Sequence, residues 1–422
     1  MPRTRVVILQ IGDVHFPEAS RGRSDVDLKD ASFPSALIGH LGGNALQAVT
    51  RSVQAVISSN KCDAIVLMGD LTSRGDKQAF WRCLQFLEQA FLRKGVTPIL
   101  PDRMVVIPGN HDVNREDAKS PNLEEKFDHI NALLNKAGMP EIKIDRSPVI
   151  RISKGAAALR IFGTNTCVGC GTLRWFPDLV REKLITTYDA AIAEAMSDSD
   201  QRKILDDLYE TLDTPMVVDA LIASLHDQIK STNDFTIVSG HHNLVPQATP
   251  RIAPYAEMIN CGRLRDALLG TRRKVIYLHG HVHDDPIHVI TNPNNKSGAL
   301  ISIGAPLMTD GFNLIEIEFA ASTSSALGCR VRKYRLKNGV VAEQPSTEIP
   351  LALDEQTTLS EDHRKMLEFI NEKRMAYGWE VLEKLKFAQD RMEEIADDLT
   401  WQNKISVERY SGVPQWVFKR AY

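Results

Sequence analysis

Five short turns of the sequence carry side chains that can bind metal ions. They read Gly12-Asp13-Val14-His15, Gly69-Asp70, Gly109-Asn110-His111-Asp112, Gly240-His241-His242 and Gly280-His281-Val282-His283. Half of the chain's 12 histidines fall in four of these turns. Carboxylates and imidazoles that converge without Lys or Arg in the same turns need a cation to be stable together. We therefore expect one metal site assembled from distant segments.

The spacing of the ligands within the turns favours convergence. Asp13 and His15 are two residues apart, as are His281 and His283, so on an extended segment each pair projects to one side. The glycine in each turn lets the backbone bend sharply and brings side chains close together. Oxygen and nitrogen ligands without a thiolate favour manganese, iron, zinc or nickel over magnesium or calcium alone.

Two adjacent histidines compete for one place in this site. The side chains of His241 and His242 diverge because the residues are neighbours. We expect His241 to be the ligand, since it follows Gly240 directly. His242 then faces the substrate or lies behind the ligands.

The segments before the turns must position them, and they alternate between strand and helix patterns. We expect strands over 6–11, 64–68 and 104–107 and helices over 44–57 and 78–92. This order predicts right-handed crossovers and a parallel sheet, whose carboxyl edge is where ligands bind. The later strand patterns predict a second, more antiparallel sheet, and they cover residues 159–163, 235–238, 274–278, 300–303, 314–319 and 329–336.

Composition divides the chain into two parts. We expect a catalytic domain over residues 1–345, with a helical cap insertion at about 168–231, and a C-terminal helical extension over 351–422. The chain has 51 Lys and Arg against 54 Asp and Glu, and the extension carries the whole net charge of −3. No strongly basic coat for nucleic acid exists, although a local basic groove remains open.

Other sequence features set the cellular context. No apolar run approaches the ~20 residues of a membrane span, and the N-terminal apolar run is too short for a secretory signal. Six cysteines in 422 residues make no disulfide framework, so we expect a cytoplasmic protein. We interpret Cys167-Val168-Gly169-Cys170 as an inert loop, because a structural zinc needs two more ligands and no partner pair exists.

Taken in order, the five turns resemble the motifs of the calcineurin-like metallophosphoesterase superfamily, over about residues 5–335. The resemblance implies an α/β fold, a four-layer α/β/β/α sandwich, holding two divalent metal ions. The implied ligands are Asp13, His15 and His283 for the first metal, Asp70 as the bridge, and Asn110, His241 and His281 for the second. His111 would contact the substrate phosphate or protonate the leaving oxygen, and Asp112 would orient His111.

The chemistry of two metals agrees with these roles. Two cations about 3.5–4 Å apart can clamp a phosphoryl group and lower the pKa of a bridging water. They also offset charge on the phosphoryl oxygens. We therefore expect a phosphodiesterase that attacks a nucleotide or nucleic acid with a metal-bridging hydroxide, with manganese as the first choice of metal. The alternatives are a phosphomonoesterase and a metal-stabilised partner-binding protein with vestigial catalysis.

Departures from subfamily patterns narrow the choice. Protein Ser/Thr phosphatases carry Glu where this chain has Asp112, and purple acid phosphatases place a metal-binding Tyr within the stretch that here reads Leu71-Thr72-Ser73-Arg74. The motifs look most like the bacterial phosphodiesterase branch that includes cyclic-nucleotide enzymes, and repair nucleases share them. Arg74 and Arg115 lie just beyond the turns and contact the substrate or form surface salt bridges. The C-terminal helices pack on the core, or bind a second copy or a protein partner.

Overall fold

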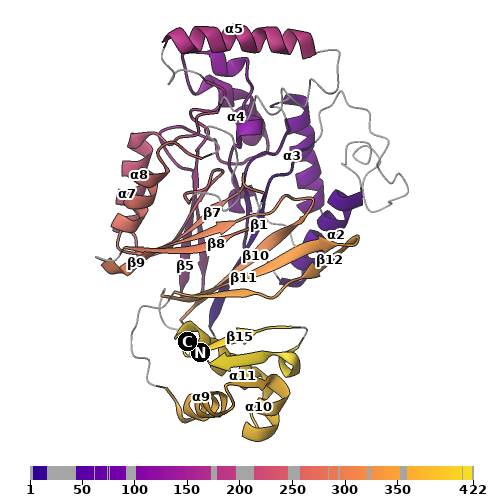
Figure 1. Cartoon of the computed structure of the whole chain (residues 1–422), viewed down its shortest axis with the longest axis vertical. Helices are drawn as coiled ribbons and strands as arrows, with labels where there is room; N and C mark the ends of the chain where they lie inside the picture. The colour runs from indigo at the N-terminus through magenta and orange to yellow at the C-terminus, as the bar shows by residue number, and fades with distance from the viewer. Residues whose placement is uncertain are drawn as a thin grey trace.

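The computed structural model contains two β-sheets with helices outside them and a smaller C-terminal unit (Figure 1). It describes residues 3–16, 44–60, 62–73, 75, 77–91, 101–172, 178–195, 213–245, 257–283, 285–292, 295–320, 325–351, 359–410 and 412–420. Every structural statement below concerns these residues.

The first sheet has seven strands in the order β12-β11-β10-β1-β2-β3, with β13 pairing to β11. Its strands are β1 (Thr4–Ile11), β2 (Ala64–Leu67), β3 (Met104–Val106), β10 (Gly311–Phe319), β11 (Ala326–Lys337), β12 (Val340–Glu343) and β13 (Thr347–Pro350). The first three run parallel, as predicted. Helices α2 (Asn44–Asn60) and α3 (Lys77–Phe91) lie between them in the chain.

The sequence interpretation placed residues 314–319 and 329–336 in the second sheet, and this was wrong. Strand β10 pairs antiparallel with β1, and β11 pairs antiparallel with β10, so both extend the first sheet. The physical reason lies in β1, whose residues 6–11 are all buried. A strand buried on both faces is an internal strand, and its second edge needs a hydrogen-bonding partner.

The second sheet has six strands in the order β4-β5-β6-β7-β9-β8. Its strands are β4 (Val149–Lys154), β5 (Ala157–Thr164), β6 (Phe235–Gly240), β7 (Lys274–His279), β8 (Ile287–Asn292) and β9 (Asn295–Gly304). The central four are parallel, and β4 and β8 are antiparallel edges. The edge strands were not predicted, because their exposed residues interrupt the apolar pattern.

Three clusters of buried apolar side chains hold the sheets and their covering helices together. The cluster between the sheets joins side chains such as Ile8 and Ile315 to Ile161 and Ile276. A second cluster packs α2, α3 and α4 (Asp128–Lys136) on the outer face of the first sheet. A third packs α7 (Asp219–Ser231) and α8 (Cys261–Gly270) on the outer face of the second. None of the described helices has the length and apolar composition that a membrane crossing requires.

The helical cap over residues 168–231 stays a prediction. Helix α5 (Asp178–Ala195) lies at the top of Figure 1, beyond the sheets. Helix α7, at the end of the same stretch, instead packs on the second sheet through Leu221 and Leu225. Residues 196–212 lie outside the described part of the chain.

The C-terminal unit is a mixed α/β structure rather than helices alone. It contains α9 (Glu361–Lys373), β14 (Met375–Tyr377), α10 (Gly378–Leu385), α11 (Gln389–Trp401), β15 (Ile405–Glu408) and β16 (Val417–Arg420). The strands form a sheet in the order β14-β16-β15. At three or four residues each, they are too short to show a period in the sequence. Met392, Ile395 and Leu399 of α11 are fully buried in this unit's own core.

Helices α10 and α11 with their short link have the order of a helix-turn-helix. In DNA-binding versions the second helix enters the major groove. Here α11 carries five acidic residues and a single arginine, Arg391, and its end packs on the first sheet. The Trp401 indole donates to Glu318 at 2.8 Å, and the ring packs against Gly328 of β11. The end of α11 therefore packs within the same chain, and the helix does not present a basic face to DNA.

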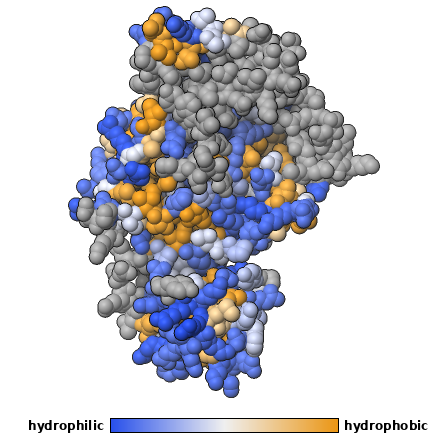
Figure 2. All heavy atoms as spheres, in the orientation of Figure 1, coloured by the Kyte–Doolittle hydropathy of each residue, from blue (hydrophilic) through white to orange (hydrophobic). Residues whose placement is uncertain are grey.

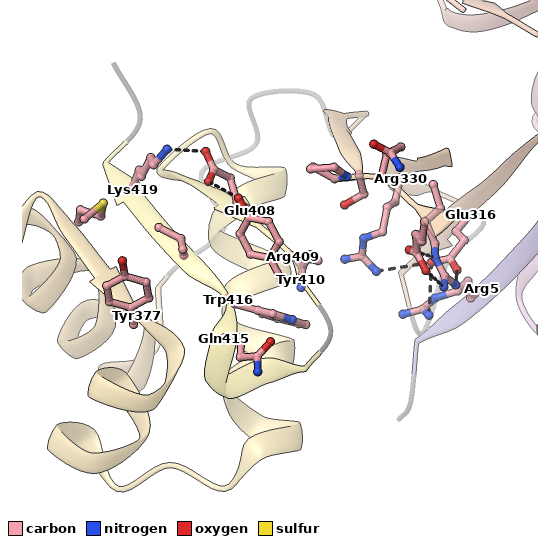
Figure 3. Close-up of a pocket in the computed structure, with 17 residues that line it drawn as sticks. Arg5, Glu316, Arg330, Tyr377, Glu408, Arg409, Tyr410, Gln415, Trp416 and Lys419 are labelled. Carbon is pink, nitrogen blue, oxygen red and sulfur yellow. Dashed lines mark hydrogen bonds and ion pairs between the residues drawn. The ribbon is translucent and has the colours of Figure 1, made fainter. Parts of the chain in front are cut away.

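A buried ion-pair network joins the two parts. Arg330 of β11 donates to Asp397 at 2.6 Å and to Glu348 at 2.9 Å. Arg409 contacts the same two carboxylates from the C-terminal side. Both arginines line a groove of about 1050 Å³, which Figure 3 shows in close-up. The view in Figure 2 shows a largely hydrophilic surface over the rest of the C-terminal unit.

We predict that Arg330→Ala destabilises the chain by about 3–5 kcal/mol, because it removes one of the two guanidinium groups that balance the buried carboxylates Glu348 and Asp397. The measurement is urea unfolding followed by circular dichroism. The matched control is Arg263→Ala, which removes an exposed ion pair with Asp219 and should cost less than about 1 kcal/mol. Equal effects of the two substitutions would contradict a stabilising role for the network.

Candidate metal centre

The five predicted turns meet at one edge of the two sheets. Turn 12–15 binds turn 69–70 through the backbone, since the amides of Val14 and His15 donate to the Asp70 carbonyl at 3.0 and 2.8 Å. The Gly280 amide donates to the His241 carbonyl at 3.0 Å. The His281 amide donates to the Asp13 carboxylate at 3.1 Å. These bonds tie turns from both sheets into one structure.

One group of ligand residues comprises Asp13, His15, Asp70 and His283. Their ligand atoms all lie within 4.8 Å of one another. The Nε2 atoms of His15 and His283 are 3.4 Å apart, and His15 Nε2 lies 3.9 Å from Asp70 Oδ2. These are the residues that the resemblance assigns to the first metal and the bridge.

A second group adjoins the first at Asp70. His241 Nε2 lies 3.0 Å from Asn110 Oδ1 and 3.3 Å from Asp70 Oδ2, and the rings of His241 and His281 are 5.1 Å apart. His241 Nδ1 donates to the Met68 carbonyl at 2.7 Å. In a neutral imidazole, Nε2 then carries a lone pair, and this lone pair faces two oxygen acceptors. A cation at this point satisfies all three atoms, so the residues present fit a metal ion.

The backbone is shaped to allow this crowding. Gly69 has φ +91°, and a Cβ there would come within 2.7 Å of the His241 ring. A Cβ on Gly109 would lie 1.9 Å from the Asp70 carboxylate. Four ligand residues also have left-handed backbones: His15, Asp70, His281 and His283. Non-glycine residues hold such conformations, at about 1–3 kcal/mol each, where the surroundings over-determine them, commonly at functional sites.

The charges of the centre are strongly coupled. Burial raises the pKa of Asp13 to about 7. Burial opposes ionisation of Asp70 as well, but the imidazoles of His241 and His111 outweigh it and hold its pKa well below the usual value. Burial disfavours the His241 cation too, yet Asp70 and Asp13 raise the pKa of this imidazole to about 9. Without a metal, His241 therefore carries a proton in the place that a metal cation would occupy.

The floor of the centre is closed and its rim is open. Asp13, Asp70, Asn110 and His241 are at most 1% exposed. The side chains of His15 and His283 are 24% and 31% exposed. Among the described residues, the rim histidines are therefore the ligands that a substrate can reach.

His111 lies at this rim, but its orienting partner differs from the predicted one. Its amide donates to Asp70 Oδ1 at 2.9 Å, and its Nδ1 donates to the Ser73 carbonyl at 3.0 Å. The carboxylate of Asp112 instead accepts from the amides of Thr72 and Gly109 at 2.8 and 2.9 Å. Asp112 thus holds two turns together, and its predicted catalytic role stays a prediction.

Asp213 is a residue of the site that sequence reasoning missed. It accepts from Asn110 Nδ2 at 3.1 Å and from both terminal nitrogens of Arg115 at 2.5 and 3.0 Å. This contact turns the Asn110 amide so that its oxygen faces His241. In the sequence Asp213 stands in an ordinary turn pattern, so no signal could have found it. The ion pair with Asp213 also balances the charge of Arg115. Arg74 lies outside the described residues.

His242 is fully buried beside the centre, and one of its ring nitrogens lies within 4.8 Å of a ring nitrogen of His241 and of His281. Its Nδ1 is 2.8 Å from the Thr166 hydroxyl, and its Nε2 has no hydrogen-bond partner among the described residues. The predicted contact of His242 with substrate stays a prediction.

Comparison with known proteins now identifies this arrangement. The model of the family described as Calcineurin-like phosphoesterase matches residues 6–285, which include every predicted metal ligand. The chain belongs to the calcineurin-like phosphoesterase family. Members of this family bind binuclear divalent metals, and the His and Asp groups described above are the plausible places for them.

Solved structures resemble the chain at low identity. The GAP50 anchor of the Plasmodium inner membrane complex is 12% identical with TM-score 0.40, covering 84% of this chain and 91% of that one. Haemophilus influenzae NAD nucleotidase is 11% identical with TM-score 0.37, covering 88% and 56%. Bacillus subtilis YfkN, a calcineurin-like phosphoesterase, is 13% identical with TM-score 0.33, covering 88% and 97%. No curated protein sequence matches the chain.

We predict that metal binding releases protons and strengthens as pH rises from about 7 to about 9. The metal needs neutral His241 and ionised Asp13, whose pKa values without metal are about 9 and about 7. Each displaced proton changes the apparent affinity by about tenfold per pH unit. Calorimetric titration with Mn²⁺ in buffers of different ionisation enthalpy measures the release. Proton-neutral binding with a pH-independent affinity would contradict this picture of the site.

We also predict that Asp213→Asn weakens Mn²⁺ binding by about 10–100-fold, the usual effect of removing an outer partner of a ligand. The substitution keeps the shape of the side chain but removes the charge that holds Arg115 beside Asn110. Asp219→Asn, on an exposed ion pair, is the control and should bind Mn²⁺ normally. Unchanged affinity in folded Asp213→Asn would show that Asp213 does not position Asn110.

Proposed function

We propose that the protein is a binuclear-metal-dependent phosphodiesterase acting on a nucleotide or nucleic-acid diester. One observation carries the proposal: His241 Nε2 faces both Asn110 Oδ1 and Asp70 Oδ2, directly beside the group that contains Asp13 and His15. The side chains that the resemblance implies as metal ligands are thus gathered at one place, which supports the proposal. A protein with vestigial catalysis would be expected to have lost at least one of these ligands.

The residues divide the work of binding and proton transfer. Asp13, His15, Asp70 and His283 would hold one cation, and Asp70, Asn110, His241 and His281 the other. Two such cations supply Lewis-acid activation of water and offset phosphoryl charge. His111 has Nδ1 fixed by Ser73, which leaves Nε2 as the ring nitrogen for a phosphoryl or leaving oxygen. A proton donated there aids departure of the leaving group.

The charges around the rim support a diester over a monoester. A phosphodiester carries one negative charge near neutral pH, whereas a monoester carries nearly two. Arg115, for which the sequence left a substrate contact and a salt bridge open, is paired with Asp213, and its side chain is only 10% exposed. The described rim thus offers imidazoles and not a free guanidinium. The runner-up, a phosphomonoesterase, would use the same centre.

Manganese is our first choice of metal for this centre. The donors are carboxylate, amide and imidazole groups without sulfur, a set that also suits iron, zinc or nickel. The partner role proposed for the C-terminal helices does not involve the end of α11, which the phosphoesterase part covers. A second copy or another protein would have to use other faces of this unit.

We predict that Mn²⁺-loaded protein hydrolyses bis-p-nitrophenyl phosphate in preference to p-nitrophenyl phosphate. Asn110→Ala should lose both metal and activity. His111→Ala should keep its metal and lose about 10²–10⁴-fold in kcat, the usual contribution of a general acid. Release of p-nitrophenol and elemental analysis measure the two quantities.

The control is His226→Ala, which changes a histidine that pairs with Asp227 on α7 and should leave both quantities unchanged. Two results would reject the proposal. A folded, metal-loaded wild type without diester hydrolysis would remove the activity itself. A strong preference for the monoester would replace it with the phosphomonoesterase.

A further inference from the structure

A second kind of ligand cluster lies behind the candidate metal centre. The structure brings Cys167 and Cys170 together with His242, and one ligand atom of each lies within 4.8 Å of the others. All three side chains are fully buried. Sequence reasoning dismissed the two cysteines for want of further ligands, and the fold supplies a third from the end of β6.

The C-x-x-C turn is built to present both sulfur atoms. The Cys170 amide donates to the Cys167 carbonyl at 3.0 Å, which closes the turn. Gly171, which follows, has φ +70°, a conformation that favours glycine. Gly169 packs so tightly that a Cβ would lie 1.8 Å from the Thr214 carbonyl. The turn is therefore fixed by its surroundings.

His242 provides an independent observation that points to a ligand. Its Nδ1 lies 2.8 Å from the Thr166 hydroxyl, and its Nε2 is enclosed without a hydrogen-bond partner among the described residues. A buried polar atom without a partner is unfavourable. Metal-binding imidazoles show this arrangement, with one ring nitrogen held by a hydrogen bond and the other on the metal.

A buried lysine ammonium group beside the cluster would be balanced by negative charge on the two cysteines. Lys126 is 1% exposed, and its ammonium donates to the carbonyls of Val168 and Cys170 at 2.5 and 2.8 Å. Among the described residues, no carboxylate is a hydrogen-bond or ion-pair partner of this lysine. Buried charges need opposite charge nearby. Two metal-bound thiolates beside the ammonium would provide it.

We propose that Cys167, Cys170 and His242 bind a third divalent cation, a thiophilic one such as Zn²⁺. Thiolate ligands select zinc, whereas carboxylate and amide oxygens suit manganese. The two places in the structure therefore take different metals. A water molecule completes the coordination, as in zinc sites with three protein ligands.

This third ion would stabilise the back wall of the catalytic centre. Cys167 Sγ lies 3.1 Å from the carbonyl of Pro108, just before the Gly109-Asn110 turn. The Gly171 amide donates at 2.8 Å to Asp213, which positions Asn110. An ion on the C-x-x-C turn would thus fix the loop that supports the second metal. Only this consequence, and not the site itself, rests on the proposed function.

Cobalt substitution tests the proposal without any use of activity. The full-length protein titrated with Co²⁺ should show sulfur-to-cobalt charge-transfer absorption in the near ultraviolet. The ligands of the binuclear centre contain no sulfur and cannot produce this band. Cys167→Ser and Cys170→Ser should each lose it, and Cys261→Ser, which changes a cysteine outside the cluster, should keep it. A saturated wild type without the band overturns the proposal, even where a variant fails to fold.

The number of bound metals gives a second readout. Elemental analysis of zinc-loaded protein should find one ion fewer per chain in Cys170→Ser than in the wild type. Equal content in the two proteins, both folded by circular dichroism, also overturns the proposal. Asn110→Ala separates this result from the proposed function, because it removes hydrolysis but no sulfur ligand and should keep the cobalt band.

Discussion

Two carboxylates buried at one point among imidazoles, with no Lys or Arg partner among the described residues, are the constraint on which this structure depends. Asp13 and Asp70 are at most 1% exposed, and burial of an unpaired charge is expensive. Without metal, His241 must carry a proton that Asp70 and Asp13 stabilise. Cations balance the same charges and also satisfy the facing lone pairs. The close glycine contacts and left-handed ligand backbones follow from bringing these groups so near to one another.

The fold meets this constraint by using both sheets. The carboxyl ends of β1, β2 and β3 deliver Asp13, Asp70 and Asn110, and β6 and β7 deliver the histidines from the other sheet. The C-terminal unit packs elsewhere: Asp398 of α11 pairs with Arg3, just before the amino end of β1, at the bottom of Figure 1. Its acidic helix is thus kept away from the metal centre. It contributes to stability through ion pairs and supplies none of the described ligands.

The sequence predicted most of the centre because its ligands stand in glycine-marked turns after apolar strands. The same reasoning failed for residues whose position depends only on contacts between segments that are distant in the sequence. Asp213 reaches Asn110 from a distant loop, and His242 reaches the cysteines from another strand, so neither pairing leaves a local pattern. Strands β10 and β11 were assigned to the wrong sheet because their apolar pattern does not reveal which edge they pair with. The short strands of the C-terminal unit fall below the length at which periodicity is detectable.

We propose that the convergent Asp, Asn and His side chains exist to hold two cations. Anomalous diffraction at the manganese absorption edge, from crystals of the Mn²⁺-loaded protein, can locate these ions. We expect two peaks that share Asp70, one beside Asp13, His15 and His283 and the other beside Asn110, His241 and His281. Well-ordered side chains with no manganese peak between them, or a single peak away from Asp70, would contradict it.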